Sequence, residues 1–140
     1  MTESEIVAFI TGLPGVKAEV ASEENGAPEE AWGDIFFSLG GPKFPFITLV
    51  KRDQPGDESS NLNREGVFRL NMKIGRAALA QLFQEGAEHD PAALDRLFPH
   101  PVYAAYGFVS VINPEVTADQ VRELILTAHA RESGTTDSVT

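Results

Sequence analysis

The stretch that decides the fold is WGDIFFSLGGPKFPFITLVKR, which occupies residues 32–52. Its first part, from Trp32 to Leu39, is rich in aromatic and branched residues, which favour β-strands. Gly40-Gly41-Pro42 follows and is typical of a turn. The remainder, from Phe44 to Arg52, has the same apolar character. We therefore predict a β-hairpin with strands at Trp32–Leu39 and Phe44–Arg52.

A third strong strand follows the long polar loop at residues 53–65. Apolar and polar residues alternate from Val67 to Ile74, so that successive side chains point to opposite faces of a sheet. A weaker alternation predicts a strand at Val16–Val20, and a last strand is predicted at Tyr106–Ile112, before the turn residues Asn113-Pro114. The sequence therefore predicts about five strands.

Helices are predicted on both sides of these strands. They run from Thr2 to about Gly12, over Gly75–Gln84, from Asp90-Pro91 to just before Pro99, and from Thr117 to about Ala128. Thr2 with Glu5, and Thr117 with Gln120, have the spacing of a capping box, which marks a helix start. An Asp followed by Pro, as at Asp90-Pro91, is also typical of a first turn.

Strands in a run, with helices before and after them, favour an antiparallel sheet with helices packed on one face. The predicted fold class is therefore α+β. A chain of 140 residues suits one domain, which we place at residues 1–132. The small polar residues at 133–140 predict a disordered tail.

The composition restricts the cellular location and the partners of the protein. It has no cysteine, which excludes disulfides and thiol nucleophiles and fits a reducing compartment. The acidic start is unlike a signal peptide, and no apolar run would span a bilayer, so we predict a cytoplasmic location and no membrane partner. A net charge of −10 disfavours nucleic acid, although residues 36–76 hold seven basic residues against four acidic ones.

Strand alternation suggests a candidate ligand site on one face of the sheet. If Phe37 lies on the helix-covered face, then Trp32, Asp34 and Phe36 point the other way, as do Arg69 and Asn71 on the third strand. Apolar walls with a few polar groups describe a small-ligand site, and an Arg there favours a carboxylate or phosphate. The alternative is an exposed sheet face with an Asp34–Arg69 ion pair.

His100 is the second candidate, together with Tyr103 just after it. Pro99 and Pro101 restrict the backbone on either side of His100. A fixed imidazole near a carboxylate could act as a general base, which makes His100 and Asp34 the candidate catalytic residues. Alternatively, His100 caps the end of the preceding helix or simply packs. No metal-ligand spacing, phosphate-binding loop or dinucleotide fingerprint occurs, so we predict no metal and no cofactor.

Several stretches resemble an uncharacterised bacterial family, largely actinobacterial, that is known only as a domain of unknown function. They are Trp32-Gly33-Asp34, Phe36-Phe37, Pro55-Gly56-Asp57, Leu62-Asn63-Arg64, Gly66-Val67-Phe68-Arg69-Leu70-Asn71, Pro99-His100-Pro101-Val102-Tyr103 and Asn113-Pro114. More distantly, the chain is similar to the MmcQ/YjbR-like group in its opening helix, its strand meander and its final strand and helix. That likeness implies a frataxin-related fold, and DNA binding has been suggested for the group. This chain differs from it in its acidic charge and its loop at residues 53–65.

The function predicted from these features is a non-catalytic binding or interaction module, because no catalytic signature is present. The alternative is a small enzyme or binder for an anionic metabolite. In that hypothesis Arg69 and Arg64 hold the anion, Asn71 orients it, and His100 or Asp34 transfers a proton. A protein partner is equally compatible with the sequence. Nucleic-acid binding through the basic middle segment is a third hypothesis, ranked last because of the net charge.

Overall fold

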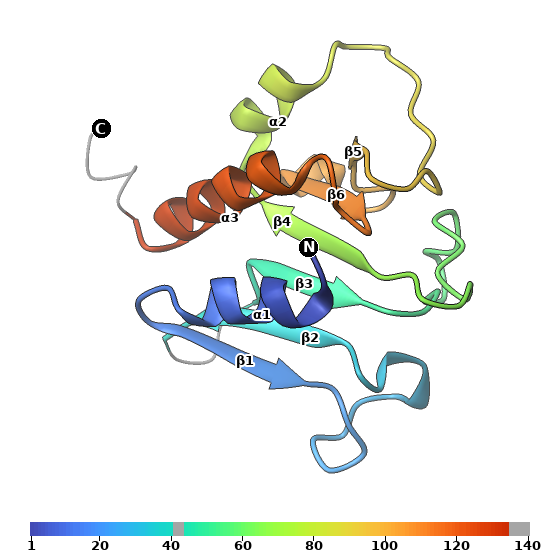
Figure 1. Cartoon of the computed structure of the whole chain (residues 1–140), viewed down its shortest axis with the longest axis vertical. Helices are drawn as coiled ribbons and strands as arrows, with labels where there is room; N and C mark the ends of the chain where they lie inside the picture. Colours follow the sequence, from blue (N-terminus) through green and yellow to red (C-terminus); the bar gives the residue numbers. More distant parts are fainter. Residues whose placement is uncertain (41–43, 135–140) are drawn as a thin grey trace.

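The computed structural model describes residues 1–40 and 44–134. Along the chain it contains α1 (Glu3–Thr11), β1 (Val16–Val20), the short 3-10 helix η1 (Glu29–Ala31), β2 (Ile35–Leu39), β3 (Ile47–Val50), β4 (Arg69–Lys73), α2 (Arg76–Leu82), β5 (Leu97–Pro99), the 3-10 helix η2 (Ala104–Tyr106), β6 (Phe108–Ile112) and α3 (Ala118–Glu132) (Figure 1). The predicted α+β class is confirmed. Most of the tail predicted at residues 133–140 lies outside the described residues, as do the turn residues Gly41 and Pro42.

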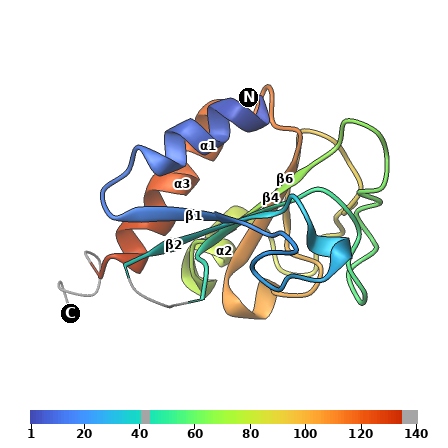
Figure 2. The ribbon, with the colours of Figure 1, turned by 90° about the horizontal axis from the view of Figure 1, so that it is seen from below.

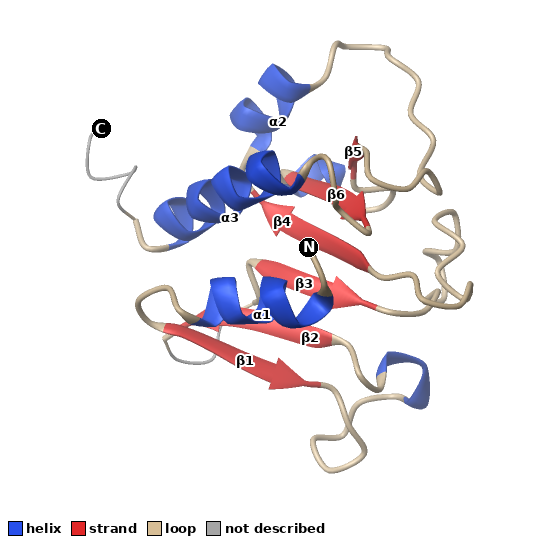
Figure 3. Ribbon diagram, in the orientation of Figure 1, coloured by secondary structure: helices blue, strands red, loops and turns tan. Residues whose placement is uncertain are grey.

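The strands form one antiparallel sheet in the order β1-β2-β3-β4-β6-β5 (Figure 3). The predicted hairpin is present, with Phe36 of β2 opposite Thr48 of β3. That row continues across the sheet through Asn71 of β4 and Ser110 of β6. The described sheet has six strands rather than five, because β5 joins its edge beside β6.

The helix predicted from Asp90 to Pro99 is wrong, since these residues form turns followed by β5. The Asp90 carboxylate accepts a hydrogen bond from the backbone N–H of Ala92 and closes a local turn. Asp95 then has a φ of 56°, a left-handed conformation that a helix does not continue through. Pro99 fits β5 because this strand lies at the sheet edge.

The two predicted capping boxes have different outcomes. Thr2 and Glu5 form theirs, with reciprocal side-chain bonds at the start of α1. Thr117 does not cap α3 with its side chain; instead its hydroxyl donates to Asp95 at 2.7 Å. The Asp95 carboxylate also accepts from three backbone N–H groups at residues 115–117. Burial raises the pKa of Asp95, but these hydrogen bonds outweigh burial and hold it well below its usual range.

Helices α1 and α3 cover one face of the sheet, which we call the helix face (Figure 2). Its core is apolar: Phe37, Ile47, Leu49, Leu70, Met72, Val109 and Val111 of the sheet pack with Ile6, Ile10, Val121, Ile125 and Ala128 of the helices. Burial of such side chains contributes about 1.5–3 kcal/mol each. The helix face therefore supplies most of the apolar stabilisation.

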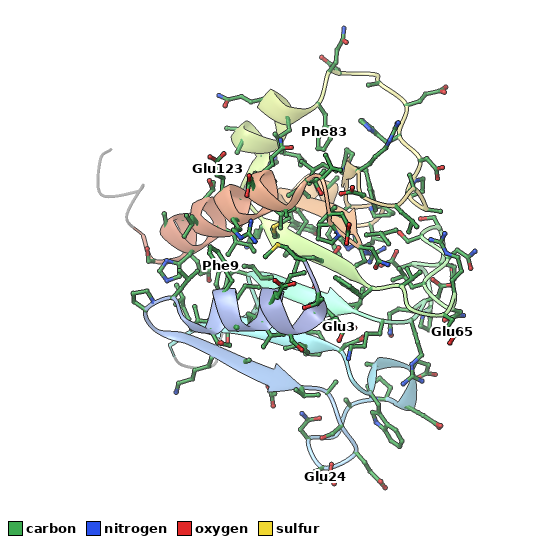
Figure 4. All side chains as sticks on the ribbon, viewed as in Figure 1. Glu3, Phe9, Glu24, Glu65, Phe83 and Glu123 are labelled. Atoms are coloured by element: carbon green, nitrogen blue, oxygen red, sulfur yellow. The ribbon has the colours of Figure 1, made fainter. Side chains whose placement is uncertain are left out.

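We call the opposite face of the sheet the cavity face. At one end it is closed by a small apolar cluster in which Leu62 and Phe98 pack on Val50 and Ile112. Helix α2 packs beside β6 and η2. The acidic residues Glu24, Glu65 and Glu123 are exposed at the periphery of the molecule (Figure 4). Within the described parts of the chain, no helix has both the length and the apolar character needed to cross a membrane.

Candidate functional site

A cavity of about 740 Å³ lies on the cavity face. Strands β2, β3 and β4 provide its floor, and the loop at 53–65 and the segment 100–108 provide its walls. Its lining includes five aromatic residues, Phe36, Phe44, Tyr103, Tyr106 and Phe108. The turn of η2, orange in Figure 2, lies on this side of the sheet, opposite α1 and α3. The site is therefore built on the side of the sheet that no long helix covers.

Arg69 lines this cavity and has only 1% of its surface exposed. Its Nη atoms form a two-point ion pair with Asp57, at 3.0 Å to Oδ1 and 2.5 Å to Oδ2. Nη1 also donates to Ser60 Oγ at 2.9 Å, and Nε donates to Asn71 Oδ1 at 3.0 Å. The remaining Nη2 hydrogen faces His100 Nε2 at 3.3 Å. The carboxylate of Asp57, the hydroxyl of Ser60 and the amide of Asn71 therefore hold the guanidinium.

Asp57 reaches Arg69 from the tip of the loop at 53–65. Gln54 and Asp57 exchange two backbone hydrogen bonds around Pro55-Gly56, which makes the tip a tight turn. Asp53 Oδ1 accepts from the Leu62 N–H at 2.7 Å, so the base of the loop is also fixed. The loop thus carries a carboxylate into the cavity and neutralises the charge of Arg69.

Asn71 joins this network to the neighbouring strands. Its Oδ1 accepts from Ser110 Oγ at 2.7 Å as well as from Arg69, and its Nδ2 donates to Thr48 Oγ1 at 3.0 Å. Asn71 is almost completely buried. Since a buried amide without partners would be costly, these contacts fix its orientation on the cavity floor.

The backbone of the Pro-His-Pro segment fixes the protonation of His100. Its Nδ1 accepts hydrogen bonds from the backbone N–H groups of Val102 and Tyr103, both at 3.0 Å. A neutral imidazole has one protonated nitrogen, so its proton must be on Nε2. Burial, and secondarily the nearby Arg69, lower the pKa of His100 to about 4, against a smaller opposite effect of Asp57. His100 is therefore a neutral hydrogen-bond donor at neutral pH.

His100 also belongs to an aromatic cluster along one cavity wall. Its ring centroid is 5.0 Å from that of Tyr103, which lies 6.2 Å from Tyr106 and 6.3 Å from Phe108. Tyr103 and Tyr106 remain half exposed or more, at 50% and 66%. An aromatic surface of this kind, open to solvent, is typical of a binding surface.

Three of the predicted site residues do not line the cavity. Asp34 accepts from the Lys51 N–H at 2.9 Å and from Gln54 Nε2 at 3.3 Å, so it anchors the loop tip from outside. Burial raises the pKa of Asp34 to about 6, although the Lys51 hydrogen bond opposes this. Trp32 donates to the Ala27 carbonyl, and Arg64 donates to carbonyl groups of residues 60, 61 and 92.

The structure thus brings together four predicted residues, Arg69, Asn71, His100 and Tyr103, and separates Trp32, Asp34 and Arg64 from them. The suggested Asp34–Arg69 ion pair is replaced by the pair of Arg69 with Asp57. Asp57 was missed because an Asp beside Pro-Gly is an ordinary turn residue. In the part of the chain that is described, His, Asp and Glu side chains form no group of three or more suited to a metal ion.

Comparison with known proteins identifies the family of this chain. A model of the family of unknown function DUF6194 matches residues 1–138. The comparisons with curated proteins and with solved structures returned no match. The resemblance to an uncharacterised family, noted from the sequence motifs, is therefore confirmed over nearly the whole chain. This protein belongs to the DUF6194 family.

Proposed function

We propose that the protein is a non-catalytic binding module that holds a small organic ligand in the cavity of the cavity face. The observation that carries this proposal is the cavity itself, about 740 Å³ in volume, with aromatic walls and a few fixed polar groups on its floor. Small-molecule sites are typically 300–1,000 Å³ in volume and combine these same features. The network around Arg69 supports the proposal, because a buried ion pair adds little stability compared with apolar packing.

The geometry supports binding rather than acid–base catalysis. Nδ1 of His100 is occupied by two backbone donors and Nε2 carries a proton, so neither nitrogen can accept one from a ligand at neutral pH. Asp34, the other candidate base, lies outside the cavity lining. Arg69 is engaged by Asp57, Ser60 and Asn71. An enzyme acting on an anionic metabolite through these residues is therefore the weaker alternative.

The exposed aromatic residues also favour a small ligand over nucleic acid. Bases can stack on side chains such as Phe44 and Tyr106, which are 90% and 66% exposed. However, such binding depends on a basic groove along the nucleic-acid backbone, and among the described residues of the cavity lining only Arg69 and Lys73 are basic. Nucleic-acid binding remains the third hypothesis for this reason and because of the net charge of −10.

Binding can be tested by titrating the protein with a panel of mono- and bicyclic aromatic compounds, monitored by amide chemical-shift changes. We expect hits whose shift changes cluster at residues 100–108 and on β4. Tyr106→Ala should weaken these hits at least tenfold, because stacking on this wall is lost. Val116→Ala is the matched control, since Val116 is apolar, 92% exposed and outside the cavity. Silence across the panel with folded protein, or equal effects of both variants, would contradict the proposal.

We also retain three predictions from the sequence as proposals. The order of an opening helix, a strand meander and a final strand with a helix supports a distant likeness to the MmcQ/YjbR-like group. The lack of cysteine supports a cytoplasmic location in a bacterium. Residues 1–132 are proposed to fold as one domain, because all six strands join one sheet. Limited proteolysis that yields two stable fragments would contradict the last of these.

A further inference from the structure

We infer that the ligand is a small organic anion, whose negative group pairs with Lys73 and whose buried end accepts a hydrogen bond from His100. This inference rests on the proposed function and assigns the chemical class of the ligand. It places the anion at a different residue from the sequence-based hypothesis, which used Arg69 and Arg64. Three features of the cavity lead to it.

The first feature is the charge balance of the cavity lining. Among the described residues that line it, the only acidic one is Asp57, which is paired with Arg69. Lys73 is the remaining charged residue of the described lining, and among the described residues it has no ion pair and no side-chain hydrogen bond. By contrast, Lys51 pairs with Glu3 at 3.0 Å. The described lining therefore has a net charge of +1, located at Lys73, in a protein whose net charge is −10.

The second feature is the His100 Nε2–H group. Its neighbour at 3.3 Å is Arg69 Nη2, which is itself a donor and cannot accept its proton. The nearest carboxylate oxygen recorded for it, Asp57 Oδ2, is 3.9 Å away, beyond hydrogen-bonding distance. Two donors therefore lie side by side in the cavity lining. A ligand oxygen or unprotonated ring nitrogen placed against both would satisfy them.

The third feature is the distance between these two groups. Arg69, beside His100, and Lys73 are four residues apart on β4, which corresponds to roughly 13 Å along an extended strand. Thr48 and Phe108, which also line the cavity, pair with Asn71 and Lys73 of this segment, and Phe36 lines the cavity on the next strand, opposite Thr48. An apolar, flat body that separates an acceptor from an anionic group matches this arrangement. The anionic group can be a carboxylate or a phosphate monoester, since an ammonium group pairs with both.

The test uses matched sets of probes: bicyclic aromatic carboxylic acids, the primary amides of the same acids, and the corresponding phosphate monoesters. We expect the acids or the phosphate esters to bind wild-type protein at least tenfold more tightly than the amides, because a charge-assisted contact is lost in the amide. Lys73→Met should remove this preference, and Lys73→Arg should retain it. If the carboxylic acids show the larger preference over the amides, the anionic group is a carboxylate. If the phosphate esters do, it is a phosphate monoester.

The outcomes separate this inference from the proposed function. If amides bind as tightly as acids and phosphate esters, or if Lys73→Met leaves the preference unchanged, the ligand class is wrong while the binding module stands. If none of the three sets binds a folded protein, the proposed function fails and the ligand class with it.

A second readout tests the role of His100 without replacing it. A long-range ¹H–¹⁵N spectrum of the imidazole should show the proton on Nε2 in the free protein. Saturation with a bound acid should shift the Nε2 resonance and leave Nδ1 bonded to the backbone. A proton on Nδ1, or an Nε2 resonance that does not respond to a tightly bound acid, would overturn the assignment of His100 as the donor.

Discussion

The helix face and the cavity face are made by the same strands, yet they bury different kinds of residue. On β4, Leu70 and Met72 enter an apolar core beneath α1 and α3, whereas Arg69 and Asn71, one position away, enter a polar network. All four are buried to at least 98%. Burial alone therefore does not distinguish the two faces; the partners of the buried groups do.

The difference shows how one small sheet can separate stability from binding. Apolar burial on the helix face is favourable by itself and needs only shape complementarity. On the cavity face each buried polar atom needs a specific partner, and these partners come from distant parts of the chain, such as Asp57 and His100. Contacts that contribute little net stability are best explained by a second role. Four predictions test this contrast, ordered by expected size.

The largest effect is expected from breaking the buried ion pair. Arg69→Met should lower the free energy of unfolding by about 3–5 kcal/mol, because Asp57 is left without its partner in a site that is 12% exposed. Adding Asp57→Asn to this variant should recover at least about 1 kcal/mol, which a double-mutant cycle in urea measures. Phe37→Ala on the helix face should cost a similar amount. The double-mutant cycle of Phe37→Ala with Asp57→Asn should show no coupling energy, unlike the cycle of Arg69→Met with Asp57→Asn. Equal coupling energies in the two cycles would contradict the contrast between the faces.

The second prediction concerns the pH dependence of stability through Asp34. Burial raises the pKa of this carboxyl in the folded protein from its ordinary value of 3.8 to about 6. The folded state then holds the proton more tightly than the unfolded state, so ionisation of Asp34 costs stability as the pH rises from about 4 to 6. The free energy of unfolding of Asp34→Asn should therefore rise by about 3 kcal/mol relative to that of wild type over this range. Above it, the difference should change little. The lowered pKa of His100 changes stability with pH in the opposite direction. This effect is the same in wild type and in Asp34→Asn, so it cancels in the difference between them.

Urea denaturation of wild type and Asp34→Asn at pH 4, 5, 6 and 7 measures this difference directly. Glu24→Gln, at an exposed loop position, serves as the control and should show no such trend. A constant difference between wild type and Asp34→Asn across the range would show that the Asp34 carboxyl is not perturbed by burial.

A third prediction tests the close backbone contact that positions the aromatic wall. Gly107 has a φ of 86°, and a Cβ placed on it would lie 2.6 Å from the backbone of Gly75. Gly107→Ala should therefore destabilise the protein by about 2 kcal/mol more than Gly86→Ala. Gly86 is the matched control, because its φ is 79° but a Cβ there would meet nothing within 4 Å. Thermal unfolding of both variants measures the difference. Equal losses of stability would show that the structure accommodates a methyl group at residue 107.

The smallest effect is expected at the residue proposed to bind the anion. Lys73→Met should change the free energy of unfolding by less than about 0.5 kcal/mol, because Lys73 makes no ion pair among the described residues. Chemical denaturation of the purified variant measures this. A loss of more than about 1 kcal/mol would instead assign Lys73 to the folding network of the cavity face, together with Arg69.

Much of the sheet was predictable because its signals are local. The alternation over Ile35, Phe37 and Leu39 correctly placed these residues on the helix face, and the alternation on β4 correctly placed Arg69 and Asn71 on the other. A period of two residues determines which side of a strand a residue occupies, independently of what the rest of the chain does. The convergence of Arg69 and Asn71 followed from the same rule.

The errors occur where a distant partner overrides a local signal. The segment from Asp90 to Pro99 has a good helix start, but Asp95 adopts a left-handed conformation and accepts hydrogen bonds at the start of α3. Thr117 has the spacing of a capping box, but Asp95 occupies its hydroxyl. Propensity is a weak signal compared with several hydrogen bonds made to another part of the fold.

The sequence alone therefore determined the class of fold, the hairpin, and the side of the sheet on which the polar residues lie, because each follows from neighbouring residues. Only the tertiary structure decided that Asp57 rather than Asp34 pairs with Arg69 and that the backbone holds the His100 proton on Nε2. It also decided that Lys73 lines an aromatic cavity without an ion-pair partner among the described residues. Hydrogen bonds and ion pairs act over a few ångströms in space, and the loops that bring these groups together carry no periodic signal in the sequence.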